Sequence, residues 1–184
     1  MTVTSTNLIL GPASLYYGEV GATEPSNIAT APASGDWTDV GGTLDGVNIA
    51  INAEYTEMMV DQIVDRVGSR LTSRAPAVET NLAEGTLTNL AWAMNNSAPV
   101  TGSGSTHILE LDQTDSGEEP LYKALIIDGR APGGKRRRII IRKTLSTENV
   151  EFAYKKDEQT VFAATFTGHY VSSSIKPIKI IDQD

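Results

Sequence analysis

The sequence predicts a mainly β protein: an antiparallel β-sandwich or partly closed barrel with one flanking α-helix and a long loop between two strands. Three observations predict it. Residues 47–55 alternate apolar and polar side chains, which is the period of a strand with one buried and one wet face. The second half of the chain holds several short segments rich in Ile, Val, Phe, Tyr and Thr, separated by polar turns. One segment, 87–94, has apolar residues at helical spacing.

The first half is organised around residues 41–95. An initial strand is expected over residues 7–17, interrupted at Gly11-Pro12, and residues 18–36 are rich in Gly, Ala, Pro, Ser and Thr, as in an exposed loop. The central strand then leads into a mixed stretch at 56–72. A returning strand follows over 72–82, where Pro76 indicates an edge position or a bulge.

A short helix should follow this returning strand. Thr86 offers an N-cap, and the helix is expected to begin at Asn81 or Thr86 and to end near Asn95-Asn96. We expect its apolar stripe to pack on the core. The stripe consists of Leu87, Leu90, Ala91 and Met94.

The second half reads as a meander of strands. The segment 155–158 is a polar hairpin turn between two of them. The expected strands are 107–112, 121–128, 137–145, 150–154 and 160–171.

Length and composition favour one globular domain, 1–184, with an ordinary core. The chain has no cysteine, which excludes disulfides and thiolate chemistry. No secretory signal or membrane-spanning segment is recognisable. The net charge of −8 lies in the first half, because residues 1–100 hold eleven acidic and three basic side chains whereas residues 101–184 hold twelve of each. Such an acidic surface either keeps the protein soluble or lets DNA pass without binding.

Motifs that suggest chemistry fail on inspection. Residues 129–136 match a phosphate-binding loop up to Lys135, but Arg136 replaces the required Ser or Thr and a strand follows in place of a helix. Residues 112–119 superficially resemble a calcium loop, yet Lys123 stands where the bidentate Glu is needed. His107 and His169 lie in separate predicted strands. We therefore expect no enzyme activity, no metal and no cofactor.

A basic cluster at 135–143 is the clearest concentration of positive charge. Nucleic-acid binding is one interpretation, but few aromatic residues accompany the cluster for base stacking. The acidic excess elsewhere offers a partner on a neighbouring subunit, so we expect an electrostatic contact between subunits. The residues assigned to it are Arg136, Arg137 and Arg138.

The stretch 56–72 mixes large aliphatic residues with charges at no settled period, so the sequence predicts a long loop. A long connection of this kind is usually functional or ordered by a partner, and apolar side chains among charges are typical of an interface. We predict an assembly element that uses Met58, Met59, Val60, Ile63, Val64, Val67 and Leu71.

Several stretches of the first half resemble one family. Trp-Thr-Asp-Val-Gly-Gly-Thr-Leu-Asp-Gly-Val at 37–47 and Val-Asp-Gln-Ile-Val-Asp-Arg-Val-Gly-Ser-Arg-Leu-Thr at 60–72 resemble the tail tube (major tail) proteins of long-tailed bacteriophages. The segments 11–18 and 79–84 add to this resemblance, which covers about the first half of the chain.

The resemblance implies a structural virion protein, made in the host cytoplasm and assembled into the tail. Six-membered rings would stack into a tube through which DNA is ejected. The implied partners are other copies of the chain and the tape measure and tail terminator proteins, and no membrane is involved. The inter-ring contact would then be the 56–72 stretch. The wet face of the central strand would line the lumen through Asn48, Asn52 and Glu54.

Two alternatives remain open. A tube subunit of a contractile injection or secretion system would share the fold and carry an effector. A monomeric β-sandwich binding module, for example one for carbohydrate, would need an exposed aromatic platform, and Trp37 and Trp92 are few and far apart in sequence.

Overall fold

The computed structural model describes residues 3–96, 100–111 and 119–183. Eight strands form one antiparallel sheet in the order β2-β1-β7-β8-β9-β4-β3, with β10 paired beside β9 on the same side of β8. A two-stranded hairpin, β5–β6, stands apart. The elements are η1 (Ser5–Asn7), β1 (Ser14–Glu19), β2 (Trp37–Asp39), β3 (Thr43–Val60), β4 (Ile63–Leu82), α1 (Leu87–Ala93), β5 (Thr101–Ser103), β6 (Thr106–Ile108), β7 (Lys123–Arg130), η2 (Pro132–Gly134), β8 (Arg136–Ser146), β9 (Phe162–Gly168) and β10 (Ile178–Asp182).

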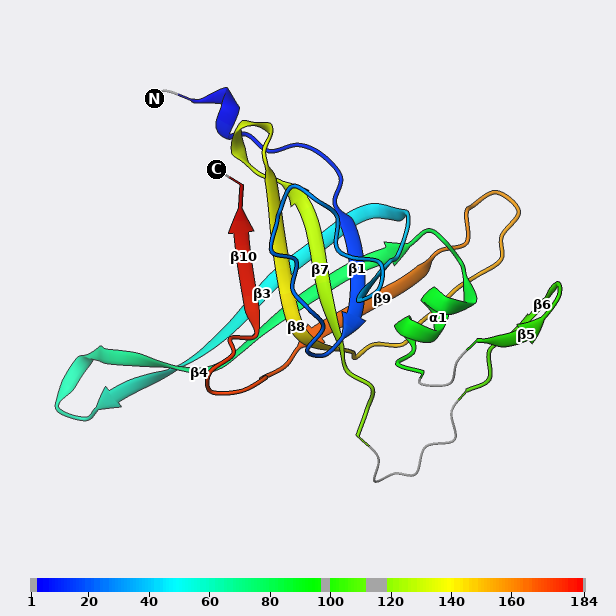
Figure 1. Cartoon of the computed structure of the whole chain (residues 1–184). Helices are drawn as coiled ribbons and strands as arrows, with labels where there is room; N and C mark the ends of the chain where they lie inside the picture. The colour runs from blue at the N-terminus through cyan, green and yellow to red at the C-terminus, as the bar shows by residue number, and fades with distance from the viewer. Residues whose placement is uncertain (1–2, 97–99, 112–118, 184) are drawn as a thin grey trace.

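This architecture confirms the predicted fold class: a mainly antiparallel β protein with one flanking helix. The sheet is open rather than a closed barrel, because within the described residues its end strands β2 and β3 do not pair with each other. Strand β8 is shared by both halves of the sheet: its first part pairs with β7 and β10, and its last residues pair with β9. The β3–β4 pair therefore crosses over β7 and β8 (Figure 1).

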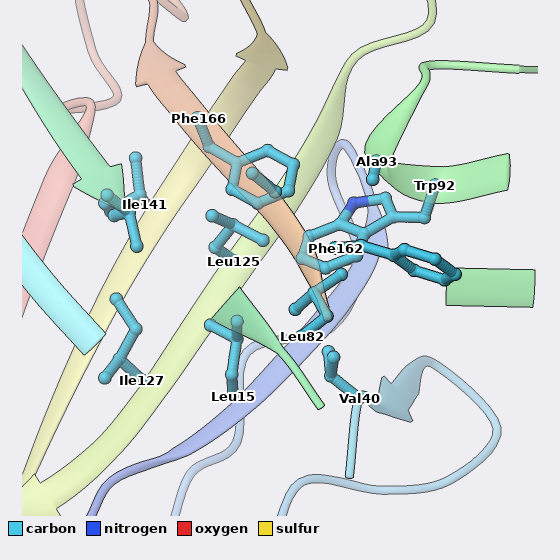
Figure 2. Packing of buried hydrophobic residues seen from close by; sticks show 12 residues of the cluster. Leu15, Val40, Leu82, Trp92, Ala93, Leu125, Ile127, Ile141, Phe162 and Phe166 are labelled. Atoms are coloured by element: carbon cyan, nitrogen blue, oxygen red, sulfur yellow. The ribbon is translucent and has the colours of Figure 1, made fainter. Parts of the chain in front are cut away.

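The main core lies between these two halves of the sheet. Trp92 of α1 stacks between Tyr17 and Phe166, with ring centroids 4.7 and 4.3 Å apart. Figure 2 shows Leu125 and Ile141 of one half directed toward Phe166 of the other. Strand residues separated by more than a hundred positions thus bury a common apolar volume, which is the dominant stabilising term for such a fold. The cluster is completed by Leu15, Val40, Val78, Leu82, Ala93, Ile127, Phe162 and Ala164.

A second, smaller core covers the opposite face of β7 and β8. Trp37 packs there against Ala124, Ile126 and Ile140, and the indole nitrogen of Trp37 donates to the Thr23 carbonyl at 2.9 Å. Both faces of β8 are therefore buried, which explains why Ile139-Ile140-Ile141 is a continuous apolar run rather than an alternating one.

The helix follows its sequence signals only in part. It has the predicted N-cap, since the Thr86 hydroxyl accepts a hydrogen bond from the backbone amide of Asn89 at 3.2 Å. Its buried face, however, is formed by Asn89, Ala91, Trp92 and Ala93, whereas the predicted residues Leu87, Leu90 and Met94 are only half-buried. The helix is seven residues long and packs beside β9, so its large aromatic side chain decides which face turns inward.

Several predicted strand boundaries differ from the structure. Residues 150–154 form no strand, and the predicted hairpin turn at 155–158 is a bend at 156–158 that connects no paired strands. The first strand begins at Ser14 rather than residue 7, and the sequence analysis did not predict β10, a strand of five residues at Ile178–Asp182. Pro76 lies just beyond the part of β4 that pairs with β9, so its missing amide proton removes no bond to β9.

Candidate assembly interface

The most conspicuous feature of the molecule is a two-stranded ribbon that projects beyond the body. Strand β4 pairs with β9 only over 77–82, so residues 51–76 of β3 and β4 pair only with each other. We call this segment the hairpin arm; it extends away from the rest of the sheet (Figure 1). The prediction of a loop over 56–72 is therefore wrong, because these residues form continuous strand with a turn at Asp61-Gln62.

The sequence concealed this strand because the ribbon contains register shifts. One lies between Glu54 and Tyr55, where Thr72 is the extra residue and its hydroxyl donates to the Glu54 carbonyl at 3.1 Å. A second lies between Met58 and Val60. A bulge moves following side chains to the other face, and it destroys the simple alternation by which a strand is recognised.

Gly68 has a different role from the turn that its residue type suggests. It lies within β4, opposite Met58, and a Cβ added at this position would come within 3.0 Å of the Met58 methyl carbon. The absence of a side chain thus leaves space for Met58 to lie across the ribbon. An ion pair between Arg66 and Glu57, 2.8 Å long, also links the two strands.

All seven residues predicted for the assembly contact lie on this arm and are exposed. The least exposed of them, Leu71, retains 43% of its accessible surface, and Val64 is fully exposed. Ile51 and Tyr55, which the prediction did not include, are exposed on the same arm. An isolated two-stranded ribbon with so many large apolar side chains in water is unusual in a monomer, and such a surface marks an interaction site. The seven are Met58, Met59, Val60, Ile63, Val64, Val67 and Leu71.

A polar face lies on the side of β3, β4 and β9 that is turned away from the main core. The Asn48 amide donates to Glu79 at 3.2 Å, and the Asn81 amide donates to Asp45 at 3.4 Å. Asp45 and Gly46 both have left-handed backbone angles, φ 62° and 82°, and form the bulge that starts the long pairing. A shallow groove lies here, and its lining includes the acidic residues Asp45, Glu79 and Glu148.

The residues predicted for a lumen surface share this polar face. Asn48, Asn52 and Glu54 alternate with the core-directed residues of β3 and are exposed, whereas Val47 and Ile49 pack against the core. Whether this face lines a lumen depends on a ring of copies, and that part stays a prediction.

The three predicted contact arginines have distinct environments. Arg138 is completely buried: its guanidinium binds Asp128 through two bonds of 2.6 and 2.5 Å and donates to the Asn27 and Thr30 carbonyls at 3.0 and 2.8 Å. This internal use corrects its assignment, because Arg138 has neither free surface nor free charge for a neighbouring subunit. Its position follows from β8, whose second face is covered by the 20–36 segment.

Arg137 and Arg136 lie nearer the surface. Arg137 forms a bidentate pair with Asp182 of β10, at 2.6 and 2.7 Å, and this pairing lowers the pKa of Asp182 and raises that of Arg137. Arg136 is exposed and donates to the Ala29 carbonyl at 2.9 Å. A contact between these two side chains and another subunit remains a prediction.

A further ion-pair network ties the 20–36 segment to β8 and β10. Glu24 binds Arg142 at 2.5 Å and Lys179 at 2.9 Å. The bond from Arg142 is the main cause of a lowered Glu24 pKa, which burial partly opposes. Sequence reasoning missed this network because Glu24 is separated from its partners by more than a hundred residues.

The two histidines and the phosphate-loop-like motif occupy separate places in the described part of the chain. Among residues 3–96, 100–111 and 119–183, no group of three or more His, Asp or Glu side chains is placed to hold a metal ion. His107 lies on exposed β6, whereas His169 contacts Tyr122 edge to face, with ring centroids 5.3 Å apart. Residues 132–134 form a short 3-10 turn between β7 and β8 rather than a helix that could face a phosphate. Most of the calcium-like segment 112–119 lies outside the described residues.

Comparisons with known proteins add no family to this description. Neither the scan against protein-family models nor the search of curated proteins returned a match. In the part of the chain that the structure describes, no helix has the length and apolar character needed to cross a membrane.

Proposed function

We propose that this chain is a structural tube subunit, a tail tube protein of a long-tailed bacteriophage, which assembles into stacked six-membered rings. The observation that carries the proposal is the hairpin arm. Nine large apolar side chains are exposed along it, although a two-stranded ribbon alone is marginal in water, so the arm is best accounted for by a partner that covers it.

Two further features support a ring-forming subunit. Strand β3 is an edge of the main sheet, so along it one row of backbone amides and carbonyls pairs with no other strand of the described residues. Exposed edges invite pairing with another chain, and closure of a ring removes them. The polar face beside this edge would then line the lumen. There the acidic side chains would repel DNA phosphates within about 8 Å, one Debye length at physiological salt, and the uncharged amide side chains would not attract them.

Of the alternatives, the carbohydrate-binding module is disfavoured by the placement of its aromatic residues. Trp37 and Trp92 are 3% and 4% exposed and belong to two separate cores, so they cannot form a surface platform. A tube of an injection or secretion system would need the same arm and edge, and it differs from the favoured function only in its cargo.

The test is electron microscopy of the purified protein beside a variant in which residues 58–68 are replaced by a short Gly/Ser linker. We expect tubes from the wild-type chain. The variant should keep its circular dichroism, apart from the ribbon signal, and should stop at monomers or isolated rings because the inter-ring contact is gone. Full-length tubes from the variant would contradict the role of the arm, and collapse of the β signal would assign the segment to the core.

A further inference from the structure

The far end of the hairpin arm has a composition that suits one particular kind of surface. We define the arm tip as residues 57–67. It carries three acidic side chains and one basic one, and the basic Arg66 is already paired with Glu57. Asp61 and Asp65 therefore remain, unpaired within the described residues, beside the exposed Ile63 and Val64. A complementary surface would be apolar at its centre and basic at its rim.

A groove of this character lies where the arm joins the body. This arm-base groove encloses about 350 Å³ between residues 71–76 of β4 and the segment 168–177 that leads from β9 to β10. Its apolar wall includes Leu71, Tyr170 and Ile175, all of them exposed. Its charged side chains are Arg74 and Lys176, and no lining residue is acidic.

The two basic side chains of the groove are available for a partner. Neither Arg74 nor Lys176 takes part in an ion pair within the described part of the chain; only the Lys176 carbonyl is engaged, by Arg142. Charge of opposite sign on the two surfaces favours their encounter and fixes the orientation of docking.

The occupant of the groove has to come from another molecule. The arm is a continuous ribbon that leads away from its own base (Figure 1), so a tip cannot reach the groove of the same chain. From Leu71 to Ile63 the eight residue steps of β4 span roughly 26 Å at about 3.3 Å per residue. A second copy of this chain supplies a tip with the required apolar centre and acidic rim.

We propose that the arm tip of one subunit docks in the arm-base groove of the next subunit along the tube. The proposal rests on the proposed function, for which it names the receiving surface. In a stack the tip of each subunit enters the groove of the next subunit, so the contact is heterologous and repeats along the tube.

Cysteine cross-linking tests the contact directly, because the chain has no native cysteine. Val64→Cys is mixed in equal amounts with Ser173→Cys, whose exposed side chain lines the groove. The control partner is Ser105→Cys, exposed between β5 and β6 and far from the arm in Figure 1. We expect at least tenfold more mixed disulfide dimer with Ser173→Cys than with Ser105→Cys. Equal yields would overturn the proposal.

A charge exchange provides a second readout that does not depend on cysteine. Asp61→Lys with Asp65→Lys, and Arg74→Glu with Lys176→Glu, should each reduce tube length or yield at least tenfold in negative-stain micrographs. Combining all four substitutions in one chain should restore tubes, since the sign of both surfaces is inverted together. Normal tubes from either double variant would show that the groove is not the receiving surface, whereas the absence of tubes from the wild-type chain would refute the tube function itself.

Discussion

The inner and outer halves of the β3–β4 hairpin belong to the same two strands, yet they differ in what covers them. In the inner half, Val47 and Ile49 pack on the core and their β4 neighbours Val78 and Leu82 are completely buried. In the outer half, Ile51 continues the same face and is half exposed, as are Tyr55 and Leu71. The change occurs where pairing with β9 ends.

This difference shows that an alternating pattern specifies a buried face but does not provide the cover. The inner half is covered by β9, α1 and the opposite half of the sheet, whereas the outer half has no such neighbour within the described residues. An apolar face that continues past its intramolecular cover is expected to be covered by another chain. The following substitutions separate the two halves by their effects on stability and on assembly.

The largest loss of stability is expected in the body, at Trp92. Trp92→Ala removes the ring that stacks between Tyr17 and Phe166, and it should lower the free energy of unfolding by about 3–5 kcal/mol. The matched change in the arm, Tyr55→Ala, should cost no more than about 0.5 kcal/mol because Tyr55 is exposed. Urea unfolding followed by circular dichroism measures both. Equal losses would mean that the arm is part of the cooperative core.

A loss of about 3 kcal/mol is expected for Arg138→Met, because the carboxylate of Asp128 would lose its ion-pair partner in a nearly buried position. Arg136→Met is the control, since Arg136 is exposed and uses one bond to a carbonyl. Thermal unfolding should separate the two variants by roughly 6–12 °C for a domain of this size. A near-native melting temperature for Arg138→Met would contradict the assignment of this ion pair to the fold.

A smaller, pH-dependent effect is expected at Glu24. Its pKa is lowered in the folded state from the ordinary value of 4.5, so the stabilisation from its ion pairs is present above pH 4.5 and is lost as the pH falls through the lowered pKa. The effect should be on the order of 1 kcal/mol because both ion pairs are partly exposed. Glu24→Gln should therefore melt below the wild type at pH 7 and together with it in strong acid. A constant difference at every pH would exclude the ion pairs as its cause.

The smallest effect on stability is expected on the polar face. Asn48→Lys with Asn52→Lys leaves the core side of β3 unchanged, so the free energy of unfolding should change by less than about 0.5 kcal/mol. If this face lines the lumen, tubes should form while DNA passage slows, since each added cation attracts phosphate. Normal ejection through such tubes, or a failure to form them, would reject the lumen assignment.

The sequence predicted those parts of the fold that depend on local patterns. The fold class, the central strand, the N-cap at Thr86 and most second-half strands follow from alternation, β-branched residues and capping chemistry. The arm was predicted as an apolar assembly element but with the wrong secondary structure, because bulges at Thr72 and near Met59 interrupt the alternation.

What could not be predicted depends on contacts between distant segments. Nothing near Arg138 in sequence indicates that the carbonyls of Asn27 and Thr30 will bind it. The sequence alone therefore suggests that the whole basic cluster is exposed. The arm-base groove likewise joins β4 to the segment before β10, almost a hundred residues later. Such sites arise only once the order of strands in the sheet is known.

The continuity of β4 also has a mechanical consequence. The same strand carries Ser73 in the arm and Val78 against Phe166 in the main core, and no loop or register shift lies between these positions. A torque applied to the exposed end is therefore transmitted along paired backbone into the aromatic stack around Trp92, rather than being absorbed by a flexible joint. A chain of such subunits would behave as a stiff rod under bending, and its rigidity would depend on the packing of each core.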